Sequence, residues 1–137
     1  MDTIIDGYQQ NSISLLPPQI YELCRFANFR KLSDLVNYLS QCQSNEEYRI
    51  ERLLGVCYKT PDAMILVMPG DDFYPSDASF TTAIIPSNKT LKEFDSQRQN
   101  RLIMLKKGNR PVWQVQYKNI PKKSDLDIQP LTDGWKA

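Results

Sequence analysis

Two adjacent carboxylates, Asp71 and Asp72 in the segment PGDD, are the best candidates for acid–base or cation chemistry in this sequence. Two neighbouring carboxylates rarely hold Mg²⁺ or Ca²⁺ alone, because these ions take about six or more oxygen ligands. The spacing of an EF-hand loop does not follow them either. Aspartate is also common in turns, where its side chain accepts hydrogen bonds from the main chain. We therefore predict that the pair caps a turn.

Basic and aromatic side chains later in the chain offer a second chemistry, the recognition of phosphate or bases. The segment KKGNR (106–110), with Arg101 nearby, concentrates positive charge, but no glycine-rich cradle or helix N-terminus accompanies it. Trp113 and Tyr117 have the types that stack on single-stranded bases, yet Val115 shares their strand face. A solvated turn and core packing are the favoured interpretations. The net charge of +1 gives no general attraction to nucleic acid.

Several catalytic chemistries are excluded by residues that the sequence lacks. Histidine is absent, which removes Ser-His-Asp triads, Cys-His pairs and most zinc sites. Nucleotide-binding glycine loops and the G-x-S-x-G nucleophile turn are absent as well. The cysteines Cys24, Cys42 and Cys57 form no C-x-x-C pair, so we expect small buried thiols. We predict no catalytic, cofactor-binding or metal-binding residue in this chain.

Localisation signals are not found. The longest apolar run, AMILVM (63–68), is far too short to span a membrane. The first residues lack the basic and apolar regions of a secretory signal, and DGWKA at the end is not a peroxisomal tripeptide. We expect an intracellular protein with reduced thiols, no membrane span and no nucleic-acid partner.

Helices are predicted in the N-terminal third. Pro17 and Pro18 suit the first turn of a helix, and the residues after them keep helical apolar spacing over 18–29. Ser33 is a candidate N-cap for a second helix, whose apolar positions continue to Cys42. Residues 1–14 are predicted to be a lead-in loop or part of a strand.

Strands follow residue 48. Segments 49–60 and 64–68 flank turn residues and predict a β-hairpin, with a bulge at Gly55 as one option. Segments 101–108 and 111–120 predict a second hairpin.

The predicted fold class is α+β, with two N-terminal helices followed by a small antiparallel sheet of two hairpins. The acidic stretch 69–77 is a loop, and 87–99 is a short polar helix or a loop. We divide the chain into a helical segment (1–45), a β extension (46–120) and a flexible tail (121–137).

The segment LLPPQIYELCRFANFRKLSDLVNYLSQC (15–42) resembles the acyl-coenzyme A diphosphatase branch of the Nudix hydrolases. That branch carries L-x-PPQ-x-YE, then R-x-x-NF, then S-L-x-x-L. A second segment, MILVMPGDDFYPSDASF (64–80), resembles the branch's apolar strand, PGD-x-x-Y and D-x-x-F. The motif positions for which we predict a structural role are Pro17, Pro18, Gln19, Tyr21, Arg25, Asn28, Phe29, Pro69, Gly70, Asp71 and Tyr74.

The resemblance implies hydrolysis of the diphosphate of coenzyme A and acyl-coenzyme A. Glutamates of the Nudix box, G-x5-E-x7-R-E-U-x-E-E-x-G, hold Mg²⁺ or Mn²⁺ in such enzymes. Here Glu46, Glu47 and Glu51 lack that spacing. By resemblance the chain is the C-terminal portion of a Nudix α/β/α protein plus an extension, with the box expected upstream of Met1. Family members are mostly peroxisomal or mitochondrial, and Mg²⁺ or Mn²⁺ is expected only in the complete enzyme.

Two functions remain open. The first is a C-terminal fragment of an acyl-coenzyme A diphosphatase that is inactive alone and whose partner is the missing N-terminal Nudix core. Its helix at 18–29 would close that core, and Tyr21 and Phe26 are expected to need a partner outside this chain. The alternative is an independent binding or dimerisation module without enzymatic activity, which would dimerise with a second copy or contact the acyl chain or a full-length relative.

Overall fold

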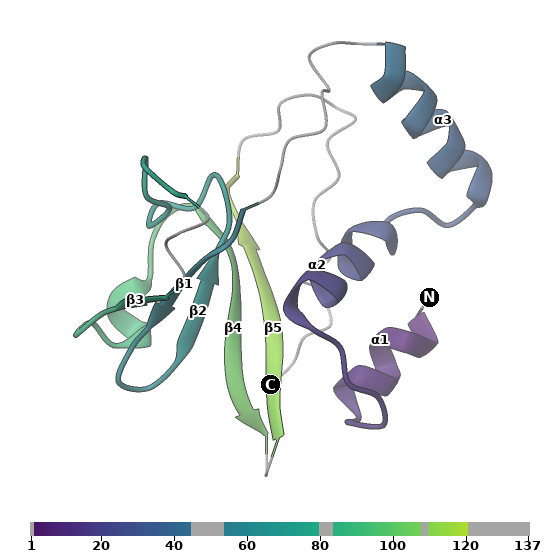
Figure 1. Cartoon of the computed structure of the whole chain (residues 1–137). Helices are drawn as coiled ribbons and strands as arrows, with labels where there is room; N and C mark the ends of the chain where they lie inside the picture. The colour runs from purple at the N-terminus through teal and green to yellow at the C-terminus, as the bar shows by residue number, and fades with distance from the viewer. Residues whose placement is uncertain (1, 45–53, 80–83, 108–109, 121–137) are drawn as a thin grey trace.

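The computed structural model describes residues 2–44, 54–79, 84–107 and 110–120. The predicted tail at 121–137 and the segment that carries Glu46, Glu47 and Glu51 lie outside the described residues. Three helices lie to one side of a sheet in Figure 1. They are α1 (Asp2–Gln9), α2 (Pro17–Phe26) and α3 (Leu32–Ser44).

The sheet has five strands in the order β3-β1-β2-β4-β5. Their bounds are β1 (Val56–Lys59), β2 (Met64–Val67), β3 (Ile84–Pro86), β4 (Gln99–Lys107) and β5 (Arg110–Lys118). The predicted α+β class is confirmed, and the two expected hairpins are β1–β2 and β4–β5. The structure adds β3, which pairs parallel with β1 and makes the sheet mixed. The 3-10 helix η2 (Leu91–Phe94) occupies the segment predicted as a polar helix or loop.

The prediction of a loop or strand for residues 1–14 is wrong, because α1 occupies most of that segment. The Tyr8 side chain of α1 is buried, and the Trp113 N–H of β5 donates a hydrogen bond to its hydroxyl oxygen at 2.6 Å. Short helices are marginal in isolation and gain most of their stability from such packing. The local sequence therefore gave little indication of α1, which depends on the contact with β5.

The start of α2 follows from its prolines. Pro17 and Pro18 occupy the first two helical positions, where a missing N–H leaves nothing unpaired. Leu16 precedes them as the cap residue, and its N–H donates to Gln19 Oε1 at 2.8 Å. The Gln19 side chain thus accepts a hydrogen bond from the N-cap N–H, a group that has no partner within the helix itself.

The end of α2 comes three residues before the predicted end at residue 29. Asn28 donates its side-chain N–H to the carbonyl oxygen of Arg25 at 2.7 Å, which satisfies one of the orphan carbonyls of the last turn. The Phe29 ring lies 5.4 Å from the Tyr38 ring, centroid to centroid, and so connects the turn to α3.

The sheet separates two apolar clusters. The helix side contains Tyr8, Ile20, Tyr21, Cys24, Met68, Leu102, Val112 and Val115. The opposite side contains Val56, Ile65, Val67, Phe94 and Ile103. The alternation of side chains along β2 explains the separation, since Leu66 and Met68 face the helices while Ile65 and Val67 face away. The sheet and α2 therefore share one core.

The expectation that Tyr21 faces an external partner is wrong. Its side chain is 4% exposed and packs within this chain, among residues of β2 and β4. Phe26, at the other end of α2, is 41% exposed. The two aromatic residues thus belong to different surroundings, because α2 rests on the sheet through the side that bears Ile20, Tyr21 and Cys24.

Candidate functional site

Asp71 lies in a buried ion pair with Arg101 of β4. The two side chains are 0% and 1% exposed, and Arg101 Nε and Nη2 donate to the two carboxylate oxygens at 2.7 Å each. The N–H groups of Phe73 and Asn100 donate to the same carboxylate at 2.9 Å. Four donors therefore surround Asp71, and this bidentate, charge-assisted geometry fixes the loop after β2 onto β4.

Arg101 also binds the connection that follows η2. Its Nη1 donates to the Phe94 carbonyl oxygen, and its Nη2 donates to Ser96 Oγ at 2.8 Å. The guanidinium carbon lies 5.7 Å from the centre of the Phe73 ring. Sequence analysis grouped Arg101 with the basic turn at 106–110, but the structure buries it. One signal was available: Arg101 alternates with Ile103, so both lie on the same face of β4.

Asp72 has a different environment from its neighbour. Its carboxylate is exposed and accepts hydrogen bonds from the Arg98 main-chain N–H at 2.9 Å and from Arg98 Nε at 2.6 Å. These hydrogen bonds hold the pKa of Asp72 below its ordinary value. The two aspartates thus pair with different arginines and do not form a shared dicarboxylate site.

Asn100 joins the two motif segments that the sequence places far apart. The Tyr21 hydroxyl of the PPQ-x-YE segment donates to Asn100 Oδ1 at 3.0 Å. Asn100 Nδ2 in turn donates to the Pro69 carbonyl oxygen of the PGD segment at 2.9 Å. Gly70 follows with a φ of 92°, a conformation that side chains rarely adopt. Asn100 was not singled out from the sequence, because a lone asparagine in a strand carries no recognisable pattern.

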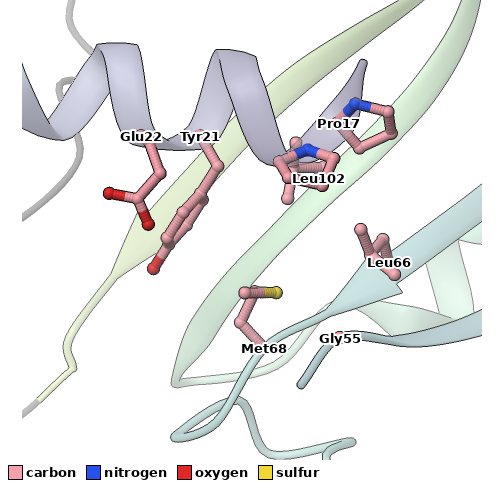
Figure 2. A pocket seen from close by; sticks show the side chains of 8 residues that line it. Pro17, Tyr21, Glu22, Gly55, Leu66, Met68 and Leu102 are labelled. Carbon is pink, nitrogen blue, oxygen red and sulfur yellow. The ribbon is translucent and has the colours of Figure 1, made fainter. Parts of the chain in front are cut away.

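A groove of about 240 Å³ opens beside Asn100, between the first turns of α2 and the sheet. Figure 2 shows Pro17, Tyr21 and Glu22 of α2 on one side, with Leu66 and Met68 opposite. Its lining residues are Pro17, Pro18, Tyr21, Glu22, Gly55, Leu66, Met68 and Leu102. Half of this lining comes from the PPQ-x-YE segment. The groove is therefore a concave feature to which this motif contributes half of the lining.

The remaining motif positions do not line the groove. Arg25 pairs with Glu22 at 3.4 Å, and its guanidinium lies 5.9 Å from the centre of the Tyr21 ring. The Tyr74 hydroxyl, beyond the PGD turn, donates to the Leu54 carbonyl oxygen at 2.9 Å. The structure thus connects Tyr21 to the PGD turn through Asn100 and places Pro17 and Pro18 in the lining of the groove.

The described residues do not fit a Mg²⁺ or Mn²⁺ site. No group of three potential ligands among histidine, cysteine, aspartate and glutamate occurs in the described part of the chain. The best candidate, Asp71, already accepts four hydrogen bonds, two of them from Arg101. A cation there would have to displace a buried guanidinium. Within the described ranges, no helix combines the length and apolar character needed to cross a membrane.

The relatives found by comparison with known proteins include three proteins that are each an acyl-coenzyme A diphosphatase NUDT19. The Gallus gallus protein is 39% identical over 77 residues, which are 56% of this chain and 20% of the relative. The Homo sapiens protein is 34% identical over 88 residues, 64% of this chain and 23% of the relative. The Xenopus laevis protein is 30% identical over 133 residues, 93% of this chain and 33% of the relative.

The chain thus spans about a fifth to a third of the length of these curated relatives. No protein-family model matches it, and no solved structure matches it significantly. The chain is related to the acyl-coenzyme A diphosphatases of the Nudix family.

Proposed function

We propose that this chain is a non-catalytic part of a coenzyme A or acyl-coenzyme A diphosphatase, whose Nudix box is supplied by another segment or chain. The observation that carries the proposal is the meeting of the two motif segments at Asn100, where Tyr21 and Pro69 bind the same side chain. Residues of the segment that resembles the diphosphatases thereby form half of the lining of a groove, next to the loop that Asp71 and Arg101 hold together. Such an arrangement suits the positioning of a substrate better than its hydrolysis.

The surroundings of the carboxylates support inactivity of the chain alone. Cleavage of a diphosphate requires strong stabilisation of negative charge, which Nudix enzymes obtain from metal ions. Asp71 is enclosed by Arg101 and main-chain N–H groups, and Asp72 is paired with Arg98. Neither aspartate is available to hold Mg²⁺ or Mn²⁺, which in this proposal bind the segment that carries the Nudix box.

The domain division and the compartment belong to the same proposal. A helical segment (1–45) and a β extension (46–120) act together, since α2 and the sheet share a core. We place the protein in the peroxisome or mitochondrion, the compartments of the branch it resembles. Microscopy of a fluorescent fusion would test this placement.

Two assays test the proposed function. The purified chain, incubated with Mg²⁺ or Mn²⁺ and either coenzyme A or octanoyl-coenzyme A, should give no hydrolysis. A chimera of the human relative, in which the 88 matched residues are replaced by those of this chain, should retain diphosphatase activity. Turnover by the isolated chain would contradict its non-catalytic role. Full activity of the human relative after deletion of the matched segment would contradict a role for the segment in the enzyme.

An independent dimerisation module is the second candidate, and α3 is the observation that favours it. Leu32, Val36 and Leu39 recur at helical spacing and are about half to three-quarters exposed. A second copy of the chain could cover this stripe. Light scattering of the purified chain over a range of concentrations would show a dimer if this function holds, and a monomer throughout would rule it out.

A further inference from the structure

We propose that the groove between α2 and the sheet binds the alkyl chain of a fatty-acyl thioester. The inference rests on the proposed function, because it takes acyl-coenzyme A as the substrate and assigns its apolar end to this groove. The walls are formed mainly by Pro17, Pro18, Leu66, Met68 and Leu102. Pockets lined in this way bind apolar groups and use only a few polar groups for orientation.

The size of the groove fits a chain of medium length. Its volume is about 240 Å³, and a group of the size of one water molecule takes roughly 30 Å³. The groove therefore has room for about eight carbon atoms. This is below the volume of about 300–1,000 Å³ that usually encloses a whole drug-sized ligand. One end of a larger molecule, with the rest outside, is the occupant that matches.

The polar groups of the groove are already engaged, which leaves apolar atoms to face a ligand. The Tyr21 hydroxyl donates to Asn100, so the Tyr21 ring and not its hydroxyl is available to the groove. The Glu22 carboxylate pairs with Arg25 at 3.4 Å. Because Glu22 is the only acidic residue of the lining, it disfavours a fatty-acid carboxylate but not an uncharged thioester.

Gly55 allows the Leu66 and Met68 side chains to lie close to the main chain that precedes β1. A β-carbon at this position would lie 2.8 Å from Leu66 Cδ1 and 3.1 Å from Met68 Sδ. A side chain there would force Leu66 or Met68, which both line the groove, to shift. The absence of a side chain at Gly55 thus leaves Leu66 and Met68 in place on the sheet side of the groove (Figure 2).

Methionine methyl groups provide the test. Met68 lines the groove, whereas Met64 and Met104 pair across β2 and β4 and do not line it. The 137-residue chain, labelled with ¹³C at methionine methyl groups, would be titrated with octanoyl-coenzyme A, butanoyl-coenzyme A, coenzyme A and octanoate. Octanoyl-coenzyme A should shift the Met68 resonance and leave Met64 and Met104 in place. Coenzyme A alone should leave Met68 unchanged.

The affinities should depend on chain length. Each methylene that the groove buries tightens binding by up to about fourfold, so octanoyl-coenzyme A should bind at least about tenfold more tightly than butanoyl-coenzyme A. Octanoate should bind more weakly than octanoyl-coenzyme A because of Glu22. Equal affinities for the two thioesters, or shifts at Met64 and Met104 without one at Met68, would overturn the proposal.

Two variants separate the groove from other apolar surface. Leu66→Trp fills the groove and should abolish the Met68 response, whereas Leu39→Trp, on α3 and outside the lining, should preserve it. If Leu66→Trp does not fold, Pro18→Trp at the exposed rim replaces it, with the same expected loss. Loss in Leu39→Trp but not in the groove variant would overturn the proposal.

The outcome for the groove is separable from that for the proposed function. An active chimera combined with an unresponsive Met68 would reject the groove and retain the diphosphatase role. A responsive Met68 combined with an inactive chimera would retain an alkyl-binding groove and reject the diphosphatase role.

Discussion

The loop after β2 and helix α3 differ in which side chains they bury: the loop buries charged side chains, whereas α3 exposes apolar ones. In the loop, Asp71 and Arg101 are fully buried and matched by hydrogen bonds. On α3, Leu32 is 76% exposed, Val36 51% and Leu39 48%. No buried side-chain nitrogen or oxygen lacks a hydrogen-bond partner in the described part of the chain. The loop is therefore complete within this chain, whereas the described residues leave the apolar stripe of α3 uncovered.

Removal of the buried carboxylate should give the largest effect. Asp71→Ala leaves Arg101 charged and buried without its partner, which costs about 3–5 kcal/mol of the free energy of unfolding. Urea denaturation followed by circular dichroism measures the loss. Asp72→Ala is the matched control, because its exposed pair with Arg98 is well solvated, and it should change stability little. Equal losses in the two variants would show that the loop is not held by the buried pair.

The link between α2 and the loop should contribute less. Tyr21→Phe removes the hydroxyl that donates to Asn100, and the buried Asn100 oxygen loses that donor. An unsatisfied buried acceptor costs about 1–3 kcal/mol. Tyr74→Phe is the control, since the hydroxyl of this half-buried tyrosine donates to the Leu54 carbonyl oxygen, which water can reach more easily. A smaller loss for Tyr21→Phe than for Tyr74→Phe would argue against Asn100 as the joint between the segments.

The loop and α3 also differ in how far the sequence reveals them. The prolines of α2, the turn residues between β1 and β2 and the alternation in β5 indicated the class and the hairpins, because periodicity and turn chemistry act locally. Burial of Arg101 depends on Asp71, 30 positions away, and the role of Asn100 depends on Tyr21 and Pro69. Alternation with Ile103 indicates the buried face of β4 for Arg101, but it does not identify the partner, because such pairings form only when strands align. The helix α1 was missed for the same reason, since Tyr8 is stabilised by β5.

The reaction rates of two cysteines, one in the sheet and one in α3, allow the sheet and α3 to be compared in the unmodified protein. Cys57 in β1 is buried, and burial raises the pKa of its thiol, so little thiolate forms at neutral pH. Cys42 in α3 is half-buried. In the native protein Cys42 should react with a thiol reagent at least about tenfold faster than Cys57, as mass spectrometry of labelled peptides would show. Because the pKa of the Cys57 thiol is raised above its ordinary value of 9.0, the reaction rate at Cys57 should still be rising at pH values above 9.0.

Cys42→Ser should remove the fast phase, and Cys57→Ser should leave it intact. Equal rates at the two sites would mean that the sheet opens as readily as α3, which would erase the difference between the regions.

Polar substitution on α3 should have the smallest effect on stability. Leu32→Gln combined with Leu39→Gln keeps good helix formers at exposed positions, so the free energy of unfolding should change by less than about 0.5 kcal/mol. Ile20→Ala is the matched helix control, because Ile20 is fully buried on α2, and it should cost about 2–5 kcal/mol. If the α3 stripe docks on a second copy or on a Nudix core, the double variant should lose that association while it remains folded. A large loss of stability in the double variant would mean that the stripe is covered within the chain itself, and the contrast between α3 and the loop would then fail.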